Sequence, residues 1–184
     1  RAHDADAGDM MQFMTSQSRL GGLLTLVCVA GAALAGSQTG GPAAPRQFPL
    51  ATNLEDTSET SANVSLGDLD ADGDLDMVLA KGRHWPLVDR VLTNDGTGRF
   101  SIADLGPTAD RTYSAVLADV NGDGSLDLVV SNDRPDAKLV YLNDGRAHFR
   151  RAGTWGAPEW TTRNATVADL NGDGRPDIIA ANRG

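Results

Sequence analysis

The sequence predicts an all-β fold built from repeated four-stranded antiparallel units, and three observations support this prediction. An acidic loop recurs three times, beginning at Asp68, Asp119 and Asp169, so that successive copies lie 51 and 50 residues apart. A segment of alternating residues precedes each loop, and a short apolar run follows it. No stretch of residues 62–184 shows a helical periodicity long enough to indicate a helix. A fixed period of this length is typical of repeat architectures.

The first two strands of each unit are expected to flank the acidic loop. Period-two alternation before the loop predicts a strand with one buried face, and a continuous apolar run after it predicts a strand buried on both faces. The alternating segments are residues 63–66, 114–117 and 164–167, and the apolar runs are residues 77–80, 128–130 and 178–180.

The third and fourth strands are expected around an Asn-Asp-Gly turn. Residues 88–92 and 138–142 lead into such turns at 94–98 and 143–147, a composition that favours tight hairpins. An outgoing strand is expected to begin near Phe100 in one unit and near Phe149 in the next. Four-stranded units at this period are the blades of a β-propeller. The sequence therefore predicts two complete blades and one partial blade, an open fragment of a larger propeller.

The acidic loops carry oxygen ligands at alternate positions, as loops that bind hard cations do. Positions 1, 3, 5 and 9 are Asp or Asn in every copy, and position 6 is always Gly. Position 7 varies, and because the guanidinium of Arg175 has no acceptor, we expect this position to contribute its backbone carbonyl. The candidate metal ligands are Asp68, Asp70, Asp72, Asp74 and Asp76 in the first loop, Asp119, Asn121, Asp123, Ser125 and Asp127 in the second, and Asp169, Asn171, Asp173, Arg175 and Asp177 in the third.

Calcium is the cofactor that these loops favour, at about three sites. Eleven carboxylates lie in the three loops, and crowded like charges need a compensating cation. The alternative is that the loops are metal-free Asx turns between strands. Magnesium suits them less, because it demands near-ideal octahedral geometry and keeps its waters. An EF-hand needs Glu at position 12, where this chain has Leu79, Val130 and Ala180.

The charge of the chain follows from these loops. Its 184 residues carry a formal net charge of −9 at pH 7, and eleven of the 25 acidic residues lie in the loops. The acidity therefore indicates a capacity to bind cations. No basic patch suggests a nucleic-acid partner.

The N-terminal part has the features of a targeting sequence. Residues 1–18 form an upstream polar segment, and residues 19–35 join a basic residue to a short apolar run ending in small residues, as in a secretory signal peptide. An uncleaved membrane anchor is the alternative, although the run is short for a span. Cleavage after Ala35 would leave a cysteine-free chain that starts with a flexible lead-in at residues 36–61. We expect a secreted or cell-envelope protein that contacts a membrane only through an uncleaved signal segment.

The loop pattern Asp-x-Asp/Asn-x-Asp-Gly-x-x-Asp before an apolar strand, with the later Asn-Asp-Gly-x-x-x-Phe turn, resembles the FG-GAP/VCBS repeats. These repeats form the propellers of integrin α-chains and of many secreted bacterial proteins. The resemblance covers residues 62–184, as repeats at about 62–110, 111–160 and, incomplete, 161–184. In that family calcium sits in the loop joining the first two strands of a blade, which implies the ligands given above. Closed propellers have about four to eight blades, so the resemblance implies an N-terminal piece of a longer propeller.

Catalysis has little support in the sequence. His84 and His148 lie in unrelated parts of the repeat, and no Gly-x-Ser-x-Gly elbow is present. We therefore expect no enzymatic activity in these repeats. Two functions stay open: a secreted calcium-binding propeller module that binds an extracellular protein or glycan, as in adhesion, or the accessory or scaffold portion of a larger secreted hydrolase or polysaccharide lyase. Trp85, Trp155 and Trp160 are expected in loops, forming an aromatic binding face or packing between blades.

Overall fold

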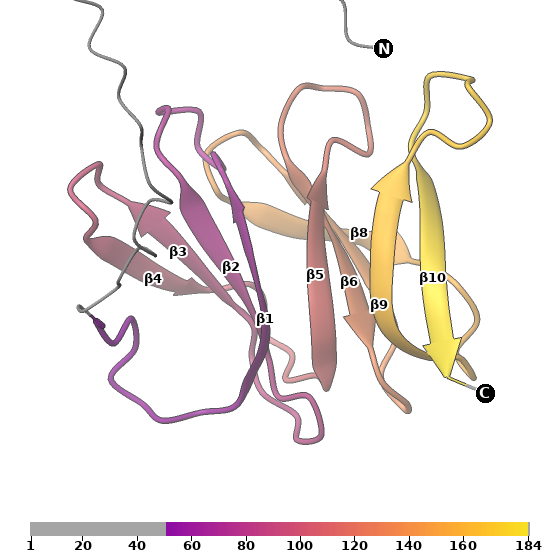
Figure 1. Cartoon of the computed structure of the whole chain (residues 1–184), viewed down its shortest axis with the longest axis horizontal. Helices are drawn as coiled ribbons and strands as arrows, with labels where there is room; N and C mark the ends of the chain where they lie inside the picture. Colours follow the sequence, from indigo (N-terminus) through magenta and orange to yellow (C-terminus); the bar gives the residue numbers. More distant parts are fainter. Residues whose placement is uncertain (1–50, 184) are drawn as a thin grey trace, which may run out of the picture. The chain divides into compact units, whose positions relative to one another are not determined.

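The computed structural model describes residues 51–183, which form three successive antiparallel sheets (Figure 1). The first sheet has the strand order β1-β2-β3-β4, the second has the order β5-β6-β7-β8, and the third consists of β9 and β10. The strands are β1 Ser61–Gly67, β2 Asp76–Lys81, β3 Arg90–Asn94, β4 Phe100–Asp104, β5 Thr112–Ala118, β6 Asp127–Asn132, β7 Leu139–Asn143, β8 Phe149–Thr154, β9 Thr161–Ala168 and β10 Asp177–Arg183. The predicted all-β class is confirmed, with two complete blades and one partial blade in an open arrangement.

Residues 51–183 contain no helix, so the search for an apolar helix long enough to span a bilayer found no candidate in this range. The predicted upstream segment and signal peptide lie outside the described residues. So do residues 36–50 of the predicted lead-in. Its remaining residues 51–60 contain no strand, and β1 begins at Ser61.

The acidic loops occupy one position in all three blades. In the antiparallel pairs, Gly67 is opposite Asp76, and Ala118 is opposite Asp127. The third blade has the same register, with Asp177 opposite Ala168. Each loop therefore joins the first two strands of its blade, and its ninth residue begins the second strand. The two Asn-Asp-Gly turns join the third and fourth strands, as predicted.

The hydrophobic core lies between the first two blades. Val78 and Ala80 of β2, buried on the side facing the second blade, cluster with Leu128 and Val130 of β6. The expected burial on both faces is confirmed for β2 and β6, whose residues are nearly all buried. It is wrong for β10, where Ile178 is 36% exposed, because no further strand of the described chain covers that sheet.

The expected buried face of β1 is also absent. Val64 and Leu66 are 51% and 58% exposed, because no sheet within residues 51–183 packs on that side of the first blade. The other side of β1 meets the second blade, where the Ser65 hydroxyl donates to the carbonyl of Ala115 in β5. Successive blades are therefore joined through their first strands, and this places the ends of β1, β5 and β9 near one another.

Candidate metal centre

The first acidic loop brings three carboxylates together. Ligand oxygens of Asp68, Asp70 and Asp76 all lie within 4.8 Å of one another, and Asp76 is fully buried. One oxygen of Asp68 and one of Asp70 are shielded from solvent and have no hydrogen-bond partner among the described residues. A buried carboxylate oxygen without a donor is costly, and a hard cation is the natural partner for these two oxygens and the neighbouring Asp76 carboxylate. The three residues fit a metal site.

Burial and the crowding of carboxylates change the pKa of one residue in this loop. Burial raises the pKa of Asp70, and the negative charges of Asp76 and Asp72 add to the rise. A cation among these carboxylates would remove that repulsion, since an opposite charge at a few ångströms favours the ionised form.

The ninth residue of each loop has a structural role that the sequence did not reveal. The two oxygens of Asp76 accept backbone N–H bonds of 2.8 Å from Leu69, within the loop, and from Asn94, at the end of β3. Asp127 does the same in the second blade, with the N–H groups of Val120 at 3.0 Å and Asn143 at 2.9 Å. Each oxygen keeps a second lone pair that a cation can use. The ninth carboxylate thus ties the loop, the second strand and the third strand together.

The third blade repeats only half of this arrangement. Asp177 accepts the N–H of Leu170 at 3.0 Å. Its other oxygen has no strand-end amide comparable to Asn94 or Asn143, because the described part of this blade has only β9 and β10.

The remaining acids of the first loop are placed differently. Asp72 accepts the N–H of Asp74 at 2.9 Å, so it closes a local turn. Asp74 lies against the Asn-Asp-Gly turn of its own blade: a Cβ added to Gly96 would come within 2.5 Å of an Asp74 oxygen. The structure therefore does not bring Asp72 or Asp74 into the three-carboxylate group. The side chain at position 7 faces the turn, which is compatible with the expected use of its backbone carbonyl.

The second and third loops satisfy their first carboxylate with backbone amides. Asp119 accepts from Gly122 at 2.7 Å and from Gly124 at 2.8 Å, and Asp169 accepts from Gly172 at 2.7 Å and Gly174 at 2.9 Å. The N–H of Gly174 lowers the pKa of Asp169. In the first loop, by contrast, Asp68 accepts only one such bond, from Gly73 at 3.1 Å.

The residue at position 3 also distinguishes the first loop from the other two. The amide groups of Asn121 and Asn171 donate to the fifth residue of their loops, Asp123 at 2.7 Å and Asp173 at 3.2 Å. Backbone donation from Ser125 and this amide bond lower the pKa of Asp123. Within residues 51–183, three acidic side chains come together only in the first loop, where position 3 is Asp70.

The packing of Leu69 explains the deeper burial of the first loop. Leu69 is 1% exposed, and its carbonyl accepts the side-chain amide of Asn143 at 2.8 Å and the backbone N–H of Ala147 at 2.9 Å. The corresponding Leu170 of the third loop is 69% exposed. The turn of the second blade therefore covers the first loop, whereas no described turn covers the third.

Loop shape depends on two left-handed residues. Position 6 is in this region in all copies, with φ of 95° at Gly73, as the sequence predicted from its invariant Gly. Position 4 is also left-handed, and in the first loop it is occupied by Ala71 with φ 63°. A non-glycine residue in this conformation is strained, so the surrounding loop must hold it there.

The histidines and tryptophans lie outside these loops. His84 Nδ1 is 3.0 Å from the hydroxyl of Tyr113, and His148 Nδ1 is 3.1 Å from Asp144, at separate places in the structure. Trp155 is half-buried and donates its indole N–H to the carbonyl of Val130. Val130 belongs to the same blade as Trp155, so this bond does not show packing between blades. Trp85 and Trp160 are 70% and 41% exposed, which argues against such packing for these two.

Fold and loops together define a propeller-blade repeat protein with an acidic loop between the first two strands of each blade. The family model of the FG-GAP-like repeat matches residues 68–130 and 119–180, which is more than half of the chain. The chain therefore belongs to the FG-GAP-like repeat family. No curated protein and no solved structure matched it.

Proposed function

We propose that these repeats form a secreted, calcium-stabilised propeller module that binds an extracellular protein or glycan, as in adhesion. The observation that carries the calcium assignment is the group formed by Asp68, Asp70 and Asp76, with two buried oxygens that have no donor. Calcium would add the missing charge and accept further oxygen ligands from the loop.

The proposed ligand set extends this group to the equivalent positions of the other loops. Asp119 and Asp169 already accept loop amides, so calcium there would bind oxygens whose charge is partly compensated. We therefore expect the first loop to bind calcium more tightly than the second and third. A spread of affinities among the sites in one titration would agree with this order, and tightest binding by a loop other than the first would contradict it.

We propose binding, not catalysis, as the role of residues 51–183. The densest acid group is assigned to the metal, the hydroxyl beside His84 belongs to the buried Tyr113, and His148 contacts a surface aspartate. The apolar run at residues 20–35 supports secretion, and calcium outside cells reaches the millimolar range that extracellular modules use.

Removal of calcium tests the proposal. An ion that binds only the folded chain stabilises it by RT ln(1 + [Ca]/Kd), about 1.4 kcal/mol per site at ten times Kd and about 4 kcal/mol for three sites. EDTA should therefore lower the Tm substantially, and calcium, but not magnesium, should restore it. Thermal melts that superimpose with and without EDTA would refute the calcium assignment.

A further inference from the structure

A hollow lies among β1, β5 and β9, at the ends of these strands opposite the acidic loops. It occupies about 490 Å³, and each blade contributes to it. Arg83 follows β2 of the first blade, Tyr113 belongs to β5 of the second, and Arg163 belongs to β9 of the third. The polar side chains that line it include those of Asn63, Arg83, Tyr113, Ser114, Arg163 and Asn164, and no carboxylate is among them.

The two arginines are held by one aromatic ring. The guanidinium carbon of Arg163 lies 4.9 Å from the centroid of the Tyr113 ring, and that of Arg83 lies 5.9 Å from it. The ring itself is buried, and its hydroxyl is 3.0 Å from His84. Cation–π contacts of this kind fix the plane of a guanidinium and leave its N–H edge available.

The two guanidiniums of the hollow differ from those of Arg90 and Arg111, which form ion pairs. Arg90 pairs with Asp104, and Arg111 forms two bonds of about 3 Å with Asp136. Within residues 51–183, Arg83 and Arg163 form no ion pair, and the Nε of Arg163 is shielded from solvent without an acceptor. A ligand cannot reach this shielded Nε, so an acceptor that enters the hollow would meet the terminal nitrogens of Arg83 and Arg163, which form no ion pair within that range.

A second hollow also has Arg163 in its lining. It measures about 630 Å³ and adds Arg134 and Arg183, together with the carboxylates of Asp133 and Glu159. The linings of the two hollows together carry four guanidiniums and two carboxylates, a positive balance in a chain whose net charge is negative.

The chemistry of the lining selects a class of ligand. Arginine binds carboxylates in a bidentate fork, and the amides and hydroxyl of Asn63, Ser114 and Asn164 suit sugar hydroxyls. Apart from Ala62 and the ring of Tyr113, the lining offers no apolar residue to anchor a peptide side chain. We propose that the first hollow, named the Arg83–Arg163 groove, binds a uronate-bearing saccharide, and that its two arginines bind the carboxylates of the sugar. The proposal rests on the proposed binding function and names its ligand class.

The test uses oligogalacturonate as the probe, at fixed calcium because uronates also bind this ion. Isothermal titration of the purified chain should show binding, and the methyl-esterified oligomer, which lacks the charge, should not bind. Arg163→Gln should weaken binding about tenfold or more, since a charge-assisted fork is lost. Arg163→Lys should also weaken it, because an ammonium cannot form the fork. Arg146→Gln, an equal loss of charge on an exposed turn, should change it less than about twofold.

Calcium stoichiometry and Tm are measured on the same samples, so that a folding defect is recognised. No binding by the wild type, equal binding of the methyl ester, or unchanged binding by Arg163→Gln would overturn the inference. Equally tight binding of oligoglutamate would also overturn it, because the site would then select anions and not saccharides. In each case, a melt that still responds to EDTA would leave the calcium-stabilised module standing. Loss of that response would count against the module itself.

Discussion

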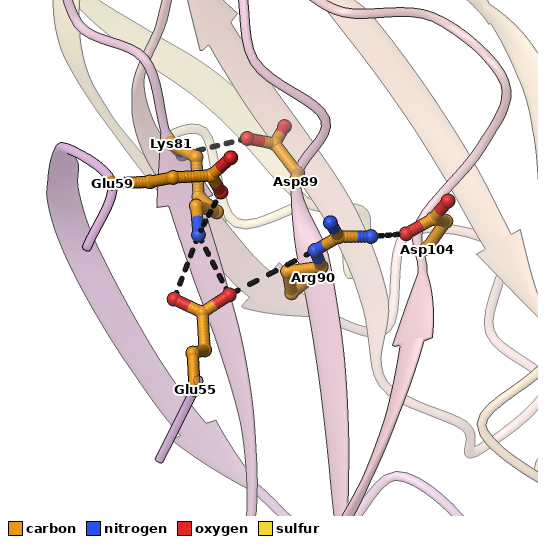
Figure 2. A network of polar contacts seen from close by, with 6 residues as sticks. All are labelled: Glu55, Glu59, Lys81, Asp89, Arg90 and Asp104. Carbon is orange, nitrogen blue, oxygen red and sulfur yellow. Dashed lines mark hydrogen bonds and ion pairs between the residues drawn. The ribbon is translucent and has the colours of Figure 1, made fainter. Parts of the chain in front are cut away.

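The two ends of β2 hold crowded carboxylates in opposite ways. At its start, Asp76 lies with Asp68 and Asp70, and no cationic side chain of the described chain compensates them. At its end, Lys81 is fully buried, and its ammonium lies 2.6 Å from Glu55 and 2.8 Å from Glu59 (Figure 2). One end of β2 therefore adjoins an acid cluster that a lysine of the chain compensates, and the other end adjoins an acid cluster without such a lysine.

This difference between the two ends of β2 indicates which cation compensates each acid cluster. Burial by itself lowers the pKa of Lys81, but the hydrogen bonds to Glu55 and Glu59, together with their negative charges, outweigh it and raise the pKa overall. The Lys81 side chain is thus a permanent part of the fold, and its two carboxylate partners come from the segment before β1. The loop at the other end offers only oxygens, so its compensating charge must come from solution.

The Lys81 cluster also extends sideways across the sheet. Asp89 accepts the backbone N–H of Lys81 at 2.7 Å, and Arg90 joins Glu55 to Asp104 (Figure 2). Residues 51–60, expected to be a flexible lead-in, therefore contribute two acids that fasten to the first blade. Removing Lys81 at one end, or calcium at the other, tests whether the clustered carboxylates at both ends destabilise the fold when their cation is lost.

The largest effect is expected from Lys81→Met. Removing one partner of a buried ion pair leaves uncompensated buried charge and costs about 3–5 kcal/mol. Urea unfolding should show this loss with or without calcium. Lys81→Met combined with Glu55→Gln and Glu59→Gln should recover much of it, since no buried charge is then unpaired. A single variant as stable as the wild type would show that the cluster contributes nothing.

The pH dependence of stability at this end should come from Asp89. Burial raises its pKa to about 7, against the charge-favouring bonds from Lys81 and Thr112. Between about pH 4 and 7 the folded chain then binds a proton that the unfolded chain does not, so the unfolding free energy falls as pH rises, by on the order of 2–4 kcal/mol. Urea melts across this range should show a shallower decline for Asp89→Asn. An identical slope in both proteins would contradict the assignment.

Asp127→Ala should separate the two roles of the ninth residue. It should remove one calcium ion from the calorimetric stoichiometry and leave two. It should also cost about 1–3 kcal/mol in EDTA, because the N–H groups of Val120 and Asn143 lose their acceptor. Asp123→Asn is the matched control, because this exposed residue should affect calcium binding but hardly the stability in EDTA. A titration that still counts three ions would show that Asp127 is not a ligand.

The smallest effect is expected from Asp70→Asn, which should raise stability in EDTA and lower it in calcium. This reversal makes it the most diagnostic variant. Asp70→Asn gives the first loop the residue found at Asn121 and Asn171. In EDTA it should stabilise the chain by about 1 kcal/mol or less, since it removes repulsion, while in calcium it should weaken binding. The reverse variant, Asn121→Asp, should do the opposite in the second loop. Destabilisation by Asp70→Asn in EDTA would mean that the carboxylates of the first loop are not strained by their charge.

Local features of the sequence predicted much of the fold. Alternation, apolar runs and Asn-Asp-Gly turns concern neighbouring residues, and the strands form where these patterns place them. The acidic loop was also readable, since its candidate ligands lie within nine consecutive residues and a glycine at position 6 permits the turn. The burial of Val64, Leu66 and Ile178 was misjudged, because exposure of a strand face depends on which sheet packs against it.

What the tertiary structure alone decided lies in the contacts between distant residues. Lys81 has no visible partner in the sequence, because its two glutamates stand more than 20 residues earlier. Similarly, Arg83 and Arg163 both contact the Tyr113 ring only because three blades meet there, although the arginines are 80 positions apart in the sequence. The different burial of the acidic loops arises from Leu69 packing under the next blade's turn. Spacing along a chain determines local geometry, but the desolvation and pairing of charges depend on how the sheets pack together.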